Sequence, residues 1–470
     1  MKRAKTSRTQ SAAKSPIAKR LRSKAAPISS ALLSPKSRSH LPLGSGAKIY
    51  SNLSITKDAS FRRDLWQYFS DKKSHACNFD KFFKVTGFIG EGNSASSTVQ
   101  IFADYSKEAK DRGTQLVLKL AFASLNPTFD NSLEVERSLY NDVINPLIFN
   151  RVTPHLITSL GVWSCDNFKP KINLKDKKLA LRISASVESI HKNDPYYDTE
   201  KMRLIILERA KGKPLDAFLR SWSFAEVKEY LPTVLFQVVY TLLCFKDIEM
   251  MHNDLHEGNL FVSILSRSGD DSGFIYVVDE RKGYALSTGV YVQLFDFDRS
   301  AVARKTAYNK VIVRNTRLDS SDGIYFGMTN EFRDKADITR LLTYVYDTLV
   351  DRFGDAGHRY VRSLGIAKPA YLRELFTNEV VPHPGMTCNT KRTDLQGPCR
   401  PYVPDDGDVL PLEDMLERLF NRIVRDGGNA APINMGMPMY KSMNLCSREN
   451  VFVRPSLRKK FKIDDQCNKK

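Results

Sequence analysis

The sequence contains few cysteines and no long apolar run, and both absences limit the class of protein. The seven cysteines are odd in number and scattered, and they include no C-x-x-C pair. This pattern disfavours a disulfide scaffold or a zinc knuckle and favours a reducing compartment. No stretch of about 18 apolar residues is available for a membrane span, and the first residues lack the apolar run of a secretory signal. The sequence therefore predicts a soluble intracellular protein.

Acidic residues are missing from residues 1–48, which contain twelve Lys or Arg and no Asp or Glu. The whole chain has 72 basic and 53 acidic residues, so the part beyond residue 48 has a net charge of only +7. Residues 1–48 are rich in Ser, Ala and Pro without hydrophobic periodicity, which predicts a disordered basic tail. Such a tail could contact nucleic acid or acidic partners, or carry a nuclear-import signal at KRLRSK (19–24). A merely solvated tail is the simpler alternative.

Beyond residue 48 the composition is that of a globular protein. Apolar residues make up 42% of the 470-residue chain, with 26 Phe and 19 Tyr, which suffices for a sizeable core. Hydrophobic spacing predicts strands at 81–92, 98–104, 114–122, 156–165, 202–210 and 291–300, and helices at 131–144, 224–248, 335–351 and 412–424. Because strands dominate before residue 210 and helices after it, we expect an α+β protein with two lobes. A Lys-rich segment, 166–200, has the appearance of an insertion.

The residues most indicative of function are HNDLHEGN, 252–259, just before an apolar stretch. Acids, amides and imidazoles so close to a buried strand are costly unless they bind a metal, a proton or a phosphate. A second acidic motif, DFD (296–298), ends a predicted strand further on. Upstream, G-E-G (90–92) ends one strand, and VLKL (117–120) places a lysine in another, followed by an acidic helix. Each motif alone is weak, whereas their order along the chain is specific.

This order of motifs resembles the protein-kinase-like superfamily over roughly residues 80–350. It is most similar to the divergent serine/threonine protein kinases of nucleocytoplasmic large DNA viruses, such as poxviruses, iridoviruses and ascoviruses. The resemblance implies a bilobal fold, with an N-lobe (49–208) of antiparallel sheet plus one helix and a mainly helical C-lobe (209–470) with C-terminal elaboration. It also implies ATP and Mg²⁺, protein substrates that include basic or nucleic-acid-associated viral proteins, and a location in host cytoplasm or virion. The basic tail adds the nucleus as a further candidate location.

The resemblance also assigns roles to the polar residues of these motifs. Asp254 would orient the acceptor hydroxyl and take its proton, while Asn259 and Asp296 would hold magnesium against the nucleotide phosphates. Lys119 lies between two leucines in a predicted strand, where an ammonium needs partners. The implied partners are the α- and β-phosphates and a helix glutamate. We expect Glu136, because it has apolar helical neighbours, with Glu134 as the alternative.

Backbone groups would hold the rest of the nucleotide. Gly90 and Gly92 would let amides approach the phosphates without a Cβ in the way. Ala95 stands where a third glycine is usual, so the shape of this phosphate loop is left open. The backbone from Glu208 to Ala210 would meet the adenine edge, unless this is an ordinary junction between a strand and a loop.

Several residues depart from the pattern of the family. Asn253 replaces the arginine that receives an activation-loop phosphate, which predicts activity without that phosphorylation. Asp298 replaces the glycine of D-F-G, which predicts a stiffer turn and makes Asp298 a further candidate for the metal shell. His256 replaces the usual lysine and is similar to the loops of aminoglycoside and choline kinases. It would contact the γ-phosphate or hydrogen-bond within the loop.

The remaining features leave the acceptor open. Asp337 would brace the backbone of the catalytic loop, but no A-P-E motif precedes the 335–351 helix, so a peptide-docking platform cannot be inferred. The segment between Asn259 and Asp296 is too long for a short hairpin, and residues 380–470 match no known pattern apart from one helix. A serine/threonine protein kinase is the leading interpretation. A small-molecule phosphotransferase of the aminoglycoside or choline kinase type is the alternative, and a binding module without catalysis is a third.

Overall fold

The architecture is seen in a computed structural model. The structure describes residues 65–69, 73–92, 98–105, 115–125, 132–169, 174–193, 197–210, 212–264, 273–287, 289–303, 332–367, 409–428, 430–435, 450–461 and 463. The predicted basic tail and residues 325–331, which occupy roughly the place of the missing A-P-E motif before the 335–351 helix, lie outside this part of the chain. Among the described helices, none is long and apolar enough to cross a membrane.

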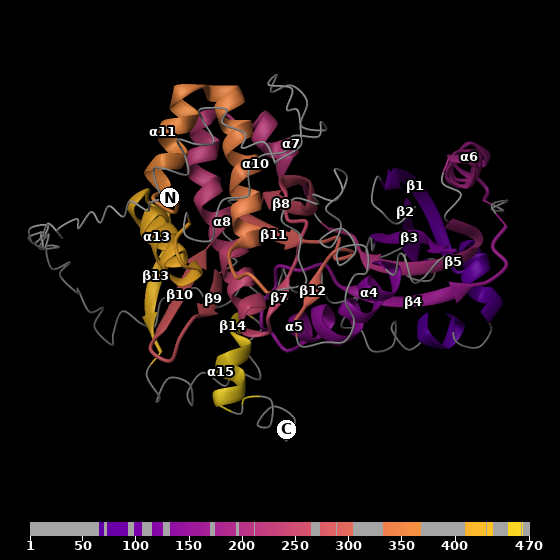
Figure 1. Cartoon of the computed structure of the whole chain (residues 1–470), viewed down its shortest axis with the longest axis horizontal. Helices are drawn as coiled ribbons and strands as arrows, with labels where there is room; N and C mark the ends of the chain where they lie inside the picture. Colours follow the sequence, from indigo (N-terminus) through magenta and orange to yellow (C-terminus); the bar gives the residue numbers. More distant parts are fainter. Residues whose placement is uncertain are drawn as a thin grey trace, which may run out of the picture. The chain divides into compact units, whose positions relative to one another are not determined.

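The first half of the described chain forms a five-stranded antiparallel sheet in the order β1-β2-β3-β5-β4 (Figure 1). Its strands are β1 (Phe83–Gly92), β2 (Thr98–Tyr105), β3 (Gln115–Ser124), β4 (Ser159–Cys165) and β5 (Tyr197–Glu208). In the central strand β3, Lys119 lies opposite Gln100 on one side and Ile205 on the other. Gln100 in turn lies opposite Gly90, so the predicted phosphate-loop glycine and the predicted active-site lysine share one row of the sheet.

Alternation along β3 sends neighbouring side chains to opposite faces of the sheet. Leu116, Leu118 and Leu120 pack into a cluster with the 3₁₀ helix η2 (Lys73–Lys81) and helix α6 (Lys177–Asn193). Ala121 instead joins the cluster of α4 (Ser132–Leu139), the π-helical turn η3 (Tyr140–Ile144) and α5 (Asn145–Phe149). Lys119, two residues before Ala121, therefore lies on the face that α4 covers.

The segment 166–200, which has the appearance of an insertion in the sequence, contributes to the packing of this sheet. It contains α6, whose apolar side chains Leu179, Ile183 and Val187 lie in the same cluster as the leucines of β3. The guanidinium of Arg182 stacks 4.5 Å from the ring centroid of Phe88 in β1. A helix with this apolar spacing buries one face of the sheet that would otherwise contact water.

A disulfide links Cys77 of η2 to Cys165 at the end of β4, with 5.1 Å between the two Cα atoms. The cysteine pattern disfavoured a disulfide scaffold, and one bridge does not form a scaffold, but a disulfide is uncommon in the reducing compartment that the same pattern favoured. The two residues are 88 positions apart, so no local spacing identified them as a pair. Cys244 is free and buried.

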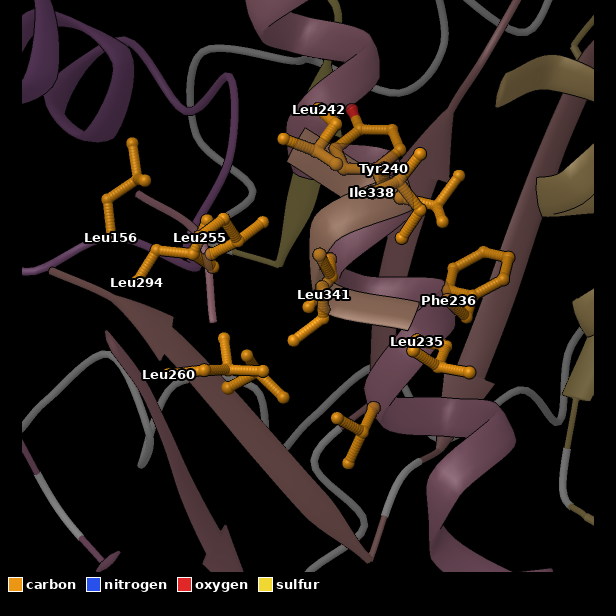
Figure 2. Packing of buried hydrophobic residues seen from close by; sticks show 14 of the residues in the cluster. Leu156, Leu235, Phe236, Tyr240, Leu242, Leu255, Leu260, Leu294, Ile338 and Leu341 are labelled. Carbon is orange, nitrogen blue, oxygen red and sulfur yellow. The ribbon is translucent and has the colours of Figure 1, made fainter. Parts of the chain in front are cut away.

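The second half of the described chain is mainly helical, with α7 (Leu215–Ser221), α8 (Phe224–Asp247), α10 (Ala336–Phe353), α11 (Asp355–Leu364) and α13 (Leu412–Arg425). Helix α8 begins with a capping box formed by Ser223 and Glu226, and it is buried along most of its length. Figure 2 shows Leu235 of α8 and Ile338 of α10 in the same apolar cluster as Leu255 of the HNDLHEGN motif. The core therefore reaches directly beneath the predicted catalytic residues.

The long segment between Asn259 and Asp296 contributes to a second sheet. Strands β9 (Gly273–Val277) and β10 (Lys282–Ser287) pair with β14 (Val451–Val453) and β13 (Ala430–Asn434) in the order β13-β10-β9-β14. The C-terminal strands are followed by α15 (Pro455–Lys460). Arg454, just before α15, forms an ion pair with Asp247 at the end of α8, with 2.6 Å between Nη2 and Oδ1. Together the described elements confirm the predicted α+β class.

Candidate active site

Two short strand pairs bring the HNDLHEGN and DFD motifs together. We call residues 252–259 the catalytic segment and residues 295–300 the DFD segment. The catalytic segment runs from β7 (Met250–Met251) to β8 (Leu260–Ile264), and the DFD segment runs from β11 (Val290–Leu294) to β12 (Ala301–Val302). Strand β8 pairs with β11, and β7 pairs with β12. Both segments are therefore held side by side at both ends, although 35 residues (260–294) separate them in the sequence.

Lys119 lies between two carboxylates from distant parts of the chain. Its Nζ is 3.1 Å and 3.0 Å from the two carboxylate oxygens of Glu136 in α4, and 3.2 Å from Oδ1 of Asp296. Lys119 and Glu136 are almost fully buried, at 2% and 1% exposure. The structure thus joins the strand lysine, the helix glutamate and the first aspartate of DFD in one cluster.

Charge interactions favour the ionised forms of Lys119 and Asp296, whereas burial raises the pKa of Glu136. Burial alone would lower the pKa of the Lys119 ammonium, but the negative charges of Glu136 and Asp296 outweigh burial and raise the pKa well above its ordinary value. Burial opposes ionisation of Asp296 as well, yet the charge and hydrogen bond of Lys119 lower its pKa. The alternative partner Glu134 is half exposed and pairs with Arg137 on the surface of α4 instead.

The DFD segment has an unusual backbone conformation at Asp296, the first aspartate of DFD. Asp296 has a φ of +65°, a left-handed conformation that Asp tolerates better than most residues. Asp298 replaces the glycine of D-F-G and was predicted to stiffen the turn. It does not have a positive φ in the described part of the chain. Phe297 is fully buried and packs edge-to-face against Tyr140 next to α4, with 5.7 Å between ring centroids. This contact ties the DFD segment to the helix that carries Glu136.

Asp298 is 1% exposed. Burial and the nearby Asp296 carboxylate raise the pKa of Asp298 well above its ordinary value. Its contribution to a metal shell stays a prediction.

The carboxylate of Asp337 binds the backbone of the catalytic segment. Its two carboxylate oxygens accept hydrogen bonds from the backbone N–H groups of His252 at 2.7 Å and Asn253 at 2.8 Å. Asn253 has a φ of +64°, and its Nδ2 donates to the carbonyl of Arg299 in the DFD segment at 3.0 Å. Nε2 of His252 lies 2.9 Å from the Phe295 carbonyl. Side chains of the catalytic segment thus bind the backbone of the DFD segment directly.

Asp254 lies on the open side of this scaffold, whereas Asn259 is buried. The Asp254 side chain is 24% exposed, and its backbone carbonyl accepts a hydrogen bond of 3.0 Å from Nδ2 of Asn259. This bond directs the amide oxygen of Asn259 away from the Asp254 carbonyl. The Asn259 carbonyl accepts a bond of 3.3 Å from the N–H of Phe295, so Asn259 lies beside Asp296.

These residues fit a hard divalent cation. Mg²⁺ commonly takes one or two carboxylates or amide oxygens from the protein and fills its shell with water and substrate phosphates. Asp296 and Asn259 would hold it. No group of three His, Cys, Asp or Glu with ligand geometry occurs in the described part of the chain, which argues against a complete metal cage made by those residues.

His256 makes a hydrogen bond within the catalytic segment. Its Nδ1 accepts from the N–H of Gly258 at 3.0 Å, which requires the ring nitrogen to be unprotonated, so the imidazole is neutral with its proton on Nε2. Burial also lowers the pKa of His256. Of the two roles considered from the sequence, the hydrogen bond within the loop is the one that the structure contains.

The predicted nucleotide-binding residues are all in or next to the five-stranded sheet. Gly90 and Gly92 lie at the end of β1, opposite Gln100 and Thr98, and Ala95 lies outside the described residues. The Glu208 N–H already donates to the carbonyl of Thr158 at 2.9 Å, so it is not available to an adenine.

Sequence reasoning missed two arginines near Asp254. Nη1 of Arg340 is 3.9 Å from Oδ1 of Asp254, and Nε of Arg299 is 3.8 Å from Oδ2. Arg340 follows Asp337 by three positions in a predicted helix, so the two residues share a helix face. That spacing was a signal for Arg340, whereas nothing in the sequence pointed to Arg299.

Comparison with known proteins, like the geometry of the site, relates the chain to kinases. No family model matches the chain. The curated protein named "Putative serine/threonine-protein kinase R400", from Acanthamoeba polyphaga mimivirus, is 25% identical over 171 residues, which are 34% of this chain and 36% of the mimivirus protein. The chain thus spans about a third of the length of the curated relative that it matches. The similarity indicates a kinase-like relationship.

Proposed function

We propose that the chain is a serine/threonine protein kinase that transfers the γ-phosphate of ATP to protein hydroxyl groups. The observation that carries the proposal is the buried Lys119, which bridges Glu136 and Asp296 at 3.0–3.2 Å. Burying an ammonium and two carboxylates is costly, and phosphoryl transfer supplies a reason, because it depends on charge neutralisation and positioning. In this proposal the sheet-containing residues 49–208 and the mainly helical residues 209–470 act as the two lobes of a kinase.

Asp254 would act on the acceptor. Its carboxylate would orient the hydroxyl and take its proton as the oxygen forms a bond to the γ-phosphorus. The bond between that phosphorus and the bridging oxygen breaks, and nucleoside diphosphate leaves with the electron pair. Mg²⁺, when bound by Asn259 and Asp296, would neutralise the phosphate oxygens.

The nucleotide would lie against the sheet. Lys119 would donate to the α- and β-phosphates while Glu136 fixes the position of its ammonium. Backbone amides near Gly90 and Gly92 would face the phosphates. Gly90 shares a sheet row with Lys119 through Gln100, and Gly92 lies in the row of Thr98 and Ala121, two residues further along β3. The carbonyl of Glu208 and the backbone of Ala210 would meet the adenine.

Asn253 supports activity without activation-loop phosphorylation. An arginine at this position would need an incoming phosphate as its partner, whereas the neutral amide of Asn253 already donates to the Arg299 carbonyl. The link between the catalytic and DFD segments is therefore made without a phosphate. Phosphatase treatment of the purified chain is expected to leave its turnover unchanged, and loss of turnover after this treatment would contradict the proposal.

The name of the mimivirus relative favours a protein acceptor over a small molecule. We include in the proposal that the substrates are basic or nucleic-acid-associated viral proteins, that the tail of residues 1–48 contacts nucleic acid or acidic partners, and that the enzyme acts inside the host cell or in the virion.

The acceptor class can be tested with γ-labelled ATP, Mg²⁺ and separate arms of basic proteins, acidic proteins and aminoglycoside or choline acceptors. Wild type is expected to label serine or threonine in protein, and Asp254→Ala is expected to lose this labelling. Labelling of small acceptors alone would favour the alternative phosphotransferase, and turnover in no arm would contradict the enzyme assignment.

A further inference from the structure

The face of the sheet that carries Lys119 also carries a glutamine that has no role in the proposed function. Gln100 of β2 lies directly opposite Lys119 of β3. The neighbours of Gln100 in β2, Val99 and Ile101, pack into the cluster with η2 and α6, as do the leucines on either side of Lys119. Because side chains alternate between the two faces of a strand, Gln100 and Lys119 point to the same side of the sheet, with about 4.5–5.5 Å between their Cβ atoms.

The ion pair of Lys119 lies on the side of β3 away from Gln100. The ammonium binds Glu136 of α4, and α4 approaches β5, since Arg203 of β5 is 3.8 Å from Glu134. Strand β2 flanks β3 on the opposite edge from β5. Gln100 therefore lies beside Lys119 on the side of β1, whose first glycine of the predicted phosphate loop is its partner in the sheet.

The other residues on this face of β2 place Gln100 between the two ends of the proposed nucleotide site. Phe102 lies two residues away in one direction, and the guanidinium of Arg209 stacks 4.2 Å from its ring centroid. Arg209 belongs to the segment proposed to meet the adenine. Thr98 lies two residues away in the other direction, opposite Gly92. At about 3.4 Å per residue, each end is about 7 Å from Gln100 along the strand.

The Gln100 side chain is partly exposed, and its amide is not used within the fold. In the part of the chain that the structure describes, no hydrogen bond joins this amide to another group. The neighbours on the same face of β2 differ from it, because Thr98 is fully buried and Phe102 is stacked by Arg209. Of these three residues, Gln100 is the one whose polar atoms can reach a bound molecule.

We propose that the amide of Gln100 binds the ribose hydroxyls of the nucleotide, an inference that rests on the proposed kinase function. With the base at the backbone of residues 208–210 and the phosphates at Lys119 and Gly92, the sugar would lie along this stretch of β2. A carboxamide contains both a donor and an acceptor, so its NH₂ group can donate to one hydroxyl while its carbonyl accepts from the other. Gln100 would thereby select ribonucleotides over deoxyribonucleotides.

A contact with the α-phosphate suits Gln100 less well. Phosphate oxygens only accept hydrogen bonds, so the carbonyl of the amide would be left without a partner. Lys119 in the same row already supplies a charged donor, which binds phosphate more strongly than a neutral amide does. The chemistry of the side chain therefore favours the sugar, whose hydroxyls are both donors and acceptors.

The experiment measures the Kd values of ATP, 2′-deoxyATP, 3′-deoxyATP and adenosine by calorimetry in Mg²⁺, for full-length wild type and for Gln100→Met, which keeps the length of the side chain but lacks the amide. Wild type should bind at least one deoxy analogue about fivefold more weakly than ATP, the effect of one hydrogen bond between uncharged groups. Gln100→Met should bind ATP and adenosine about fivefold more weakly than wild type does. It should bind that deoxy analogue within about twofold of wild type, because the bond is already missing there. Gln67→Met, at an exposed position of residues 65–69, is the matched control, with unchanged Kd values.

The outcomes separate this inference from the proposed function. If wild type binds ATP and both deoxy analogues equally well, or if Gln100→Met keeps the full discrimination between them, the role of Gln100 is wrong and the kinase assignment stands. If Gln100→Met weakens ATP and both analogues by the same factor and leaves adenosine unchanged, the amide binds phosphate, which also overturns the inference. A wild type that binds no ATP contradicts the kinase assignment itself. Should Gln100→Met unfold, Gln100→Ala decides by the same comparison.

Discussion

Replacing Glu136 by glutamine tests whether the contact between Glu136 and Lys119 contributes to stability as a buried ion pair or only as much as a surface contact would. The substitution keeps the shape of the side chain but removes the charge that lies 3.0–3.1 Å from Nζ of Lys119. Breaking one side of a buried pair costs roughly 3–5 kcal/mol. Asp296 still lies 3.2 Å from the ammonium and continues to compensate part of its charge. We therefore expect a loss of stability near the lower end of this range, about 3 kcal/mol.

The assay is urea unfolding followed by tryptophan fluorescence, together with the KM for ATP. Glu136→Gln should lower the unfolding midpoint at unchanged slope, and it should raise the KM for ATP because Lys119 is no longer held in place. The matched control is Glu134→Gln, two residues earlier on the same helix, where the exposed pair with Arg137 is worth about 0–1 kcal/mol. Equal destabilisation by the two substitutions would refute the reasoning.

A double substitution tests the same pair from the other direction. Lys119→Met combined with Glu136→Leu replaces the pair with apolar groups, which is often neutral for stability, but it also removes the ammonium 3.2 Å from Asp296. Because the Asp296 side chain is 21% exposed and can be hydrated, the double variant should still be more stable than Glu136→Gln, and it should have no kinase activity. Activity in the double variant would contradict the role proposed for Lys119.

Three further substitutions address other parts of the scaffold. Asp337→Ala removes the acceptor of two buried backbone N–H groups. At about 1.5–3 kcal/mol for each bond to a charged group, unfolding measurements should show a loss of roughly 3–6 kcal/mol, and an unchanged midpoint would refute the bracing role. Burial raises the pKa of Glu257 from 4.5 to about 7, so the folded state binds a proton that the unfolded state releases. The free energy of unfolding should therefore fall by up to about 3 kcal/mol as pH rises from 4.5 to 7. Glu257→Gln should abolish this decline in a pH series of unfolding curves, and an identical decline in the variant would show that another group causes it. Cys77→Ser removes the disulfide to Cys165, so it should lower the free energy of unfolding by about 2–4 kcal/mol. The melting temperature of the variant should not change with dithiothreitol, whereas that of wild type should fall. A wild-type melting temperature that dithiothreitol leaves unchanged would show that the bridge contributes nothing.

Local patterns predicted much of the candidate site. Asp254 and Asn259 lie five positions apart in one segment, so their spacing is visible in the sequence. The resemblance to kinases implied a helix glutamate as the partner of Lys119, and the apolar neighbours of Glu136 on its helix favoured it over Glu134. These inferences depend on residues that are close in the chain, where the geometry of a strand or a helix determines which side chains share a face.

Contacts between distant segments could not be predicted in the same way. The bridge between Cys77 and Cys165 joins residues 88 positions apart, and strand β9 pairs with β14 near the far end of the chain. Such pairings depend on how whole elements pack, which no periodicity encodes. Arg299 belongs to the same class, because its position near Asp254 depends on the pairing of β7 with β12.

The positive φ in the DFD segment also differed from expectation. The sequence drew attention to Asp298, because it replaces a glycine, whereas the structure places the left-handed conformation at Asp296. The backbone turns where the carboxylate must reach Lys119, so the tertiary contact and not the local substitution determines which residue adopts it.

The most direct test of the central claim is the dependence of ATP affinity on Mg²⁺, measured by calorimetry for wild type and for Asp296→Asn. If Lys119, Asn259 and Asp296 gather around the phosphates of one nucleotide, wild type should bind ATP at least tenfold more tightly with Mg²⁺ than with EDTA, and Asp296→Asn should lose this gain. A wild type that binds no ATP, or an Asp296→Asn variant with the full magnesium gain, would contradict the account.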